Sequence, residues 1–170
     1  YNVTHLLKNC LFSIKKYLGN ISYEVIVIDN NSTDTSWKDI ISEFPEFHFI
    51  ASETNDGFAK ANNKAIQTSN GEYLLILNPD TEIEGFYMQE VLDFADSKAA
   101  FGCLGLRMHD ANGVFLPESK RSVPDMFNSF EKLFTKFKKN TSKSYYRNDI
   151  GEFEVAEVEV ITGAFFLVKN

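Results

Sequence analysis

Apolar residues follow two different periods along the first hundred positions, and the two periods alternate. Apolar positions three and four apart predict amphipathic helices. These helices are expected at residues 4–18, through residues 37–41, and at residues 58–66. Apolar runs between them predict interior strands, buried on both faces, at residues 24–29 and 73–77. A short strand is expected at residues 47–51.

The pattern after residue 84 is less regular. Residues 110–113 form a predicted turn into 114–116, as in a hairpin with a short loop. Apolar residues between 153 and 160 change parity, which predicts a bulge or break near Ala156. The other expected elements are a helix at 85–95, a strand at 100–108, a helix at 124–139, a loop at 142–152 and an apolar run at 165–168.

The order of these elements predicts the fold class. Strands that alternate with helices call for a parallel sheet joined by right-handed crossovers. We therefore expect a Rossmann-like α/β domain with a mixed, mostly parallel sheet flanked by helices. Such a domain begins with a strand, whereas this chain opens on a helix, so we expect the first strand to lie before Tyr1. A length of 170 residues fits one domain.

Composition narrows the class of protein. Hydrophobic residues make up 44% of the chain and charged residues 24%, which is typical of a globular protein rather than a disordered or fibrous one. The net charge of −7 argues against nucleic-acid binding, because that binding needs a basic face that neutralises phosphates. An anionic ligand must then be met locally, by a metal, by helix N-termini or by a few Lys and Arg side chains.

Cysteine content and hydropathy point to a compartment. Cys10 and Cys103 are the two cysteines, which suits free core thiols in a reducing environment. No apolar stretch approaches the roughly 20 residues that cross a bilayer, so we expect a cytoplasmic protein. A lysine cluster lies in a Phe-containing segment and has two interpretations. It could contact a membrane surface or an anionic acceptor, or it could be the solvated face of a helix, and the second interpretation is favoured. These lysines are Lys132, Lys136, Lys138, Lys139 and Lys143.

The candidate chemistry begins where the strand at 73–77 ends, at Asn78-Pro79-Asp80. Open α/β sheets bind ligands outside the carboxyl ends of their strands, and an Asp placed there after a rigid proline suits a divalent cation. The alternative is an ordinary turn, because Asp and Pro are favoured turn residues.

Asp29 follows the end of another strand, so we expect its carboxylate and that of Asp80 to face one crevice. An acidic residue in this position can hydrogen-bond a ribose or a base N–H. The alternative for Asp29 is an Asx turn ahead of Asn30 and Asn31. A dehydrogenase is disfavoured, because the chain contains no GxGxxG motif.

Three blocks of residues, in this order and spacing, carry a resemblance to a known family. They are VIVIDNNSTD at 25–34, NDGFAKANN at 55–63 and LNPDT at 77–81. Together they closely resemble the family 2 glycosyltransferases with the GT-A fold, and most strongly the branch that includes bacterial rhamnosyltransferases. The resemblance extends from Tyr1-Asn2, which is similar to the end of the family's first strand, to residues 163–166, which are similar to its acceptor-side segment.

The resemblance implies a site for a nucleotide-sugar linked to UDP, dTDP or GDP. Asp29 resembles the carboxylate that receives the nucleobase or ribose. Asp80 resembles the second acid of the DxD motif, which holds Mn²⁺ or Mg²⁺ against the donor diphosphate. Asn78 replaces the first Asp and removes one charge from the metal site. The other implied donor-binding residues are Asn31, Asn55, Gly57, Phe58 and Asn62; for Phe58 and Asn62, helix packing and capping is the alternative.

The resemblance also implies the reaction. A hexosyl group would pass, with inversion and metal assistance, to a saccharide or lipid-linked acceptor in bacterial cell-surface polysaccharide assembly. Thr162, Gly163 and Ala164 are implied on the acceptor side. The family's catalytic base follows that segment, so we expect it beyond Asn170. The chain is therefore expected to be one GT-A domain truncated at both ends, which need not turn over substrate by itself.

Two other functions remain open from the sequence. One is a non-catalytic domain that binds a nucleotide-sugar, which would have no acidic residue shortly after Asn170. The other is a sugar nucleotidyltransferase, which would have a glycine-rich loop before Tyr1. The flanking sequence discriminates between these functions and the transferase.

Overall fold

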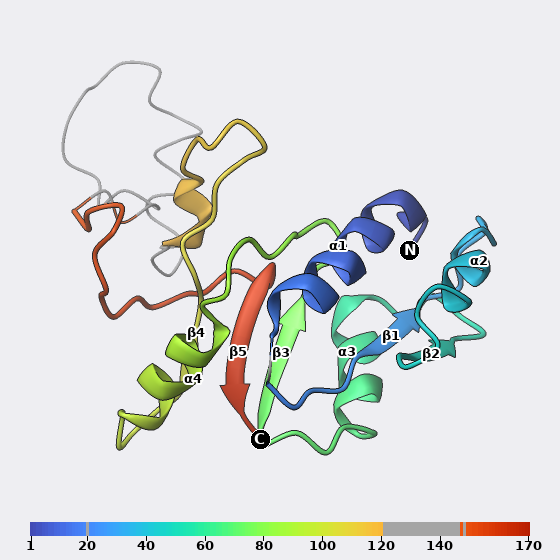
Figure 1. The fold of residues 1–170 in the computed structure, drawn as a ribbon, viewed down its shortest axis with the longest axis horizontal. Helices are drawn as coiled ribbons and strands as arrows, with labels where there is room; N and C mark the ends of the chain where they lie inside the picture. Colours follow the sequence, from blue (N-terminus) through green and yellow to red (C-terminus); the bar gives the residue numbers. More distant parts are fainter. Residues whose placement is uncertain (20, 121–146, 148) are drawn as a thin grey trace, which may run out of the picture.

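The computed structural model describes residues 1–170 except for residues 20, 121–146 and 148. Figure 1 shows the elements in chain order. They are α1 (Thr4–Tyr17), β1 (Ile26–Asp29), α2 (Trp37–Ile41), β2 (His48–Ala51), α3 (Phe58–Ile66), β3 (Tyr73–Leu77), α4 (Met88–Asp96), β4 (Cys103–Leu104), the 3-10 turn η1 (Pro117–Ser119) and β5 (Phe165–Lys169).

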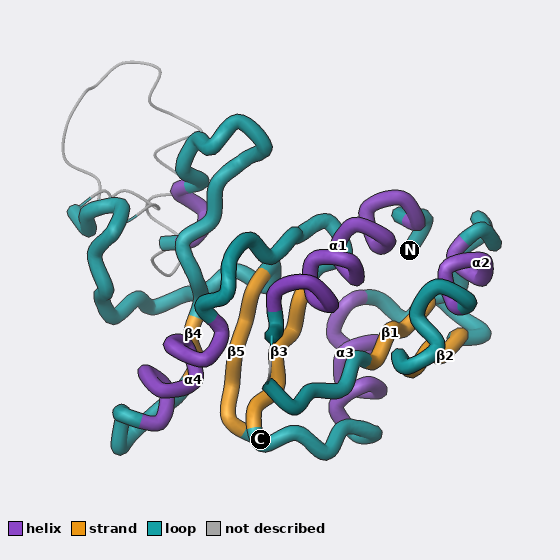
Figure 2. The backbone as a smooth tube through the Cα atoms, in the orientation of Figure 1, coloured by secondary structure: helices purple, strands orange, loops and turns teal. Residues whose placement is uncertain are grey.

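The described strands form two sheets (Figure 2). β1 and β2 pair in parallel, with Asp29 opposite Ala51, as the alternating pattern predicts. β5 lies between β3 and β4 and is antiparallel to both. The predicted mostly parallel sheet is therefore seen only in the β1–β2 pair. The central strand of the second sheet comes from the far end of the chain and enters in the opposite direction.

The core includes residues of α1, α2, α4 and β5, and partly buried side chains of both sheets pack against it. One face of α1 is buried, including Leu11 at 2% exposure. Phe165 and Leu167 of β5 are also buried, whereas Phe166 and Val168 between them are half-buried. This alternation is the period of two expected of a strand with one covered face. The predicted helix at 4–18 is confirmed and ends at Tyr17.

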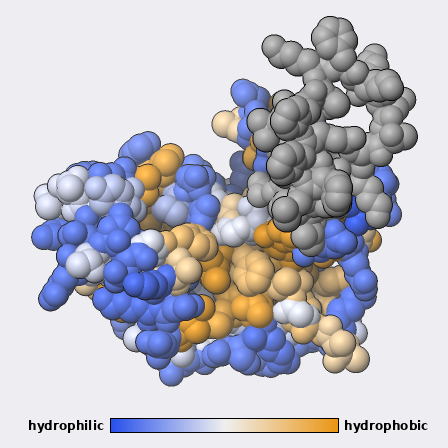
Figure 3. All heavy atoms as spheres, turned by 180° about the vertical axis from the view of Figure 1, so that it is seen from behind, coloured by the Kyte–Doolittle hydropathy of each residue, from blue (hydrophilic) through white to orange (hydrophobic). Residues whose placement is uncertain are grey.

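The other face of the second sheet is less covered than the sequence predicts. All five residues of β3 are half-buried: Tyr73, Leu75 and Leu77 pack against the core, and Leu74 and Ile76 alternate with them. α3 contains no buried residue. Figure 3 shows apolar residues gathered across the middle of the rear surface. The prediction that β1 and β3 are buried on both faces is therefore wrong for the described structure.

Several element boundaries after residue 84 differ from the prediction. α4 begins at Met88 rather than at residue 85, because Gly85 has a φ of 96°, which a right-handed helix does not allow. The predicted strand at 100–108 is reduced to β4, which pairs with β5 at Cys103 and Leu104 alone. The predicted hairpin is confirmed by an antiparallel bridge between His109 and Phe115.

The segment at 153–159 forms no strand. Phe153 and Val155 are 82% and 78% exposed, so the apolar pattern there has no partner surface among the described residues. The predicted helix at 124–139 and the lysine cluster lie outside the described residues. None of the described helices has both the length and the apolar character of a membrane span.

Candidate active site

Contacts between loops link the three sequence blocks, although β1 and β3 belong to different sheets (Figure 1). The first link joins the turn after β1 to the turn before α3. The Asn30 side-chain amide donates to Oδ1 of Asn55 at 2.8 Å, and Oδ1 of Asn30 accepts the Asp56 N–H at 3.1 Å. Asn55 Oδ1 also accepts the Gly57 N–H at 3.2 Å. Asn30, which was not predicted as a site residue, therefore fixes the turn that precedes α3.

Asp29 is half-buried and its carboxylate turns back onto its own loop. Both of its oxygens accept the Ser32 N–H, at 3.3 and 3.0 Å, and one also accepts the Ser32 hydroxyl. The local alternative for Asp29 is therefore what is observed, although the contact reaches Ser32, three residues on, rather than the two residues of an Asx turn. Asn31 takes a φ of 62°, a left-handed conformation that Asn tolerates better than most residues. Contacts of Asp29 or Asn31 with a donor stay predictions.

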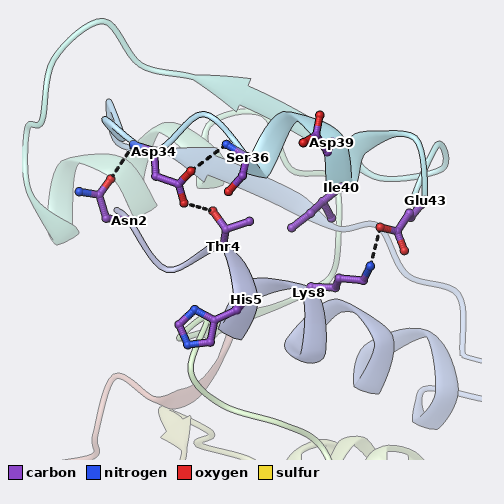
Figure 4. Close-up of a pocket in the computed structure, with 9 residues that line it drawn as sticks. All are labelled: Asn2, Thr4, His5, Lys8, Asp34, Ser36, Asp39, Ile40 and Glu43. Atoms are coloured by element: carbon purple, nitrogen blue, oxygen red, sulfur yellow. Dashed lines mark hydrogen bonds and ion pairs between the residues drawn. The ribbon is translucent and has the colours of Figure 1, made fainter.

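Asn2 fixes the same loop from the other side, although no separate role was predicted for it. Its Oδ1 accepts the N–H groups of Thr33 at 3.0 Å and Asp34 at 3.2 Å. Figure 4 shows it on the rim of a pocket between the start of α1 and α2. There the pKa of the exposed Asp34 carboxyl is lowered, first by hydrogen bonding to Ser36 and then to Thr4. The loop after β1 is thus held at several backbone positions.

The start of α3 presents an exposed aromatic ring. Gly57 precedes the helix with a φ of 83°, a conformation that favours glycine, and Phe58 is 58% exposed. The Asn62 side-chain amide donates to the Phe58 carbonyl within the helix at 2.8 Å. For Asn62 the observed contact is therefore the helical alternative, and its contact with a donor stays a prediction.

The predicted acceptor-side segment links α3 to the end of β3. A Cβ added at Gly163 would lie 3.3 Å from Cζ of Phe58, so Gly163 sits against that ring. The Ala164 carbonyl accepts the Asn78 N–H at 3.1 Å, and the Ala164 N–H donates to Oγ1 of Thr162 at 3.3 Å. The structure therefore brings residues 162–164 together with Asn78 and Phe58.

Asp80 projects from a β-turn. The Thr81 N–H donates to the Asn78 carbonyl at 3.1 Å, which closes the turn with Pro79 and Asp80 at its centre. The carboxylate of Asp80 is exposed, and within the described part of the chain it forms no hydrogen bond or ion pair. The turn interpretation and the ligand interpretation are therefore compatible, because the turn leaves this carboxylate available.

The donor set around Asp80 decides which kind of metal site fits. The described residues contain no group of three or more His, Cys, Asp or Glu side chains that could hold a metal ion. A cage made by the protein alone therefore does not fit the described residues. Mg²⁺ is commonly bound by one or two carboxylates together with waters and substrate phosphates. Asp80 fits a metal ion of that kind, which arrives with a diphosphate.

A second cleft lies beside Asn30, between the end of β2 and α3. Lys64 on its wall contacts Oγ of Ser52 at 3.4 Å, and Lys60 pairs with Asp56 at 3.9 Å. Lys60 lies within the block at 55–63 and Lys64 follows it, but nothing in the sequence distinguishes them from lysines on a solvated helix face. They place positive charge close to the turn that Asn30 holds.

Comparison with known proteins agrees with this arrangement. The profile described as glycosyl transferase family 2 matches residues 1–160, which include all three blocks and most of the described fold. The chain belongs to glycosyl transferase family 2. Membership implies the GT-A α/β fold.

Several curated glycosyltransferases and a polysaccharide synthase are similar to this chain. TuaG of Bacillus subtilis, a glycosyltransferase named for teichuronic acid biosynthesis, is 25% identical over 119 residues, 67% of this chain and 46% of TuaG. A poly-beta-1,6-N-acetyl-D-glucosamine synthase of Staphylococcus epidermidis is 27% identical over 92% of this chain and 42% of the synthase. Glycosyltransferase GlyA of Streptococcus pneumoniae is 34% identical over 52% of this chain and 13% of GlyA. The chain spans less than half the length of each.

The thiol of Cys10 lies beneath the strand end that leads to Asp80, with its sulfur 3.8 Å from the Asn78 carbonyl. Burial, followed by the nearby carboxylates of Glu82 and Asp80, raises the pKa of Cys10 to about 12. The thiolate is the reactive form, so Cys10 should resist alkylation at pH 8 while the exposed Cys103 reacts.

Mass spectrometry after iodoacetamide treatment tests this: one adduct is expected on the native chain and two in denaturant. The Cys103→Ser variant is the control, because its native form should take none. Alkylation of Cys10 in the native protein as fast as in denaturant would contradict the buried thiol.

Proposed function

We propose that this chain is the donor-binding region of an inverting, metal-assisted glycosyltransferase. It would bind a UDP-, dTDP- or GDP-linked sugar and support transfer of a hexosyl group to a saccharide or lipid-linked acceptor. The observation that carries the proposal is a series of contacts that links the loops after β1 and β3 to the loops before α3 and β5. Asn30 contacts Asn55, Gly163 lies against Phe58, and Ala164 bonds Asn78. Every block that resembles the family takes part in this series.

The metal is assigned to Asp80 together with the donor diphosphate. A divalent cation there would neutralise charge on the leaving nucleoside diphosphate as the glycosidic bond breaks. Asn78 at the start of the same turn adds a neutral oxygen and no charge. The N-terminus of α3 carries Phe58, which lies against Gly163, and the positive end of a helix favours phosphate oxygens. These features support the diphosphate side of the site.

The acceptor side is assigned to Thr162, Gly163 and Ala164, because they separate the Phe58 ring from the turn that carries Asp80. The names of the relatives, which include a poly-beta-1,6-N-acetyl-D-glucosamine synthase, support a role in cell-surface polysaccharide assembly. Donor binding is the activity proposed for these residues.

Calorimetric titration with a panel of UDP-, dTDP- and GDP-sugars, with and without Mn²⁺, tests the proposal. One nucleotide class is expected to bind, and to bind more tightly when Mn²⁺ is present. The full-length protein should be titrated in parallel, because it supplies the strand expected before Tyr1. Failure of the full-length protein to bind any of these sugars with Mn²⁺ would refute the proposal.

A further inference from the structure

The turn that carries Asp80 rests on α1. Three residues of this helix contact the segment at 78–83: Asn9 contacts Glu82, Cys10 contacts Asn78, and Ser13 contacts Ile83. Asn9 donates from its side-chain amide to Oε1 of Glu82 at 3.2 Å, across an exposed surface. The contacts of Cys10 and Ser13 are more buried and reach the main chain.

Ser13 makes the most enclosed of these contacts. Ser13 is only 7% exposed, and its hydroxyl oxygen accepts the Ile83 N–H at 2.9 Å. The same hydroxyl donates to the Cys10 carbonyl at 2.7 Å, which fixes the direction of its lone pairs. Ile83 itself is 2% exposed and belongs to the core. The residue three positions after Asp80 is thus held by both its main chain and its side chain.

The other end of the turn is also tied down. The Asn78 N–H donates to the Ala164 carbonyl at 3.1 Å, and the Asn78 carbonyl faces the Cys10 sulfur at 3.8 Å. Asp80 lies between these two anchors, and no described side chain bonds its carboxylate. The direction of the carboxylate is therefore set by the backbone of the turn, and that backbone is set by its anchors.

We propose that Ser13 is a positioning residue that orients Asp80 for the metal–diphosphate complex. This inference rests on the proposed function. Removing the hydroxyl leaves the Ile83 N–H buried without its acceptor, which is costly, so the segment must shift until that N–H finds another partner. The shift moves the turn and turns the carboxylate away from the metal. Residues that orient a metal ligand typically change metal affinity by about 10- to 100-fold when they are replaced.

Ser13→Ala tests this, with Ser119→Ala as the matched control. Ser119 is also 7% exposed, and its hydroxyl also donates to the carbonyl three residues back, at 2.8 Å from the Leu116 oxygen. None of its described hydrogen bonds reaches the segment at 78–83. Free Mn²⁺ is measured by electron paramagnetic resonance while the full-length protein is titrated with UDP, and with dTDP and GDP in parallel.

Ser13→Ala should bind Mn²⁺ about 10- to 100-fold more weakly in the nucleotide complex, whereas Ser119→Ala should match the wild type. Binding of the nucleoside without phosphates should be unchanged in both variants, because the base and ribose do not touch the metal. Ser13→Thr should recover most of the affinity, since its hydroxyl can take the same position. If Ser13→Ala fails to fold, Ser13→Cys, which keeps the side-chain shape but accepts hydrogen bonds weakly, should show the same loss.

The outcomes separate this inference from the proposed function. A wild-type protein that binds no Mn²⁺ with any of the three nucleotides overturns both. A wild-type protein that binds Mn²⁺, together with Ser13 variants that bind it equally well, overturns the role of Ser13 alone. Equal losses in Ser13→Ala and Ser119→Ala also overturn it, because they indicate a general loss of stability.

Discussion

Replacing Asp80 with alanine is expected to abolish metal-dependent donor binding and to leave the fold intact. Among the described residues, no group of three or more potential ligand side chains could hold the ion in its place. The side chain is exposed and forms no described hydrogen bond or ion pair. Exposed substitutions of this kind change the free energy of unfolding by about 0.5 kcal/mol or less. Calorimetry with and without Mn²⁺ gives the binding, and a thermal melt gives the stability.

Glu82→Ala is the matched control for that experiment. Glu82 is an exposed carboxylate two residues later on the same segment, and its described partner is Asn9. Its loss removes the same charge from the surroundings of the turn, so a purely electrostatic effect would appear in both variants. We expect Glu82→Ala to keep metal-dependent binding. Retention of that binding in Asp80→Ala would remove the metal assignment.

The sequence predicts the elements best where a local period is strong. α1, α3 and β3 lie within a few residues of their predicted positions, because their apolar spacing alone indicates the type of element. The pairing of β5 between β3 and β4 joins segments far apart in the chain, and no local pattern encodes it. Phe153 and Val155 show the converse: a strand-like alternation forms no strand when no described surface receives its apolar side.

The candidate site shows the same division between local and long-range information. Asn78, Asp80 and Gly57 were found from the sequence because turn chemistry and a family motif mark them. Asn2 and Asn30 were missed because their roles depend on which loops meet. An Asn in a polar turn looks the same in the sequence whether it bonds solvent or a second turn. The family resemblance at Tyr1-Asn2 pointed to Asn2, but it did not indicate what the Asn2 side chain would contact.

Asp29 shows that a position at a strand end does not fix what a carboxylate does. Its oxygens accept hydrogen bonds from Ser32, whereas Asp80, also after a strand, forms no described hydrogen bond or ion pair. The difference follows from the residue three positions on: Ser32 offers Asp29 a hydroxyl and an N–H, whereas Ile83 has no hydroxyl and donates its N–H to Ser13. Asp29 therefore stabilises its own loop in this structure, and any contact with a nucleobase or ribose must be made in addition to those hydrogen bonds.

Replacing Phe44 with alanine is expected to be the most destabilising of the changes considered. Phe44 is 0% exposed, stacks on Phe47 at a ring-centroid distance of 5.3 Å, and meets the edge of Phe12 of α1 at 5.0 Å. Truncation of a buried Phe removes its apolar contacts and leaves a cavity, which costs about 3–5 kcal/mol. That is a large fraction of a typical folding free energy. Urea unfolding followed by circular dichroism measures the loss.

Two further variants separate the cavity from other causes. Phe44→Leu keeps most of the apolar volume, so it should lose clearly less than Phe44→Ala. Phe153→Ala removes the same ring from a residue that is 82% exposed and should change stability by less than about 1 kcal/mol. Equal losses in Phe44→Ala and Phe153→Ala would mean that the packing of Phe44 against Phe12 does not hold α1 in place. Since α1 supports the turn that carries Asp80, Phe44→Ala should also weaken Mn²⁺ binding at temperatures well below its unfolding transition.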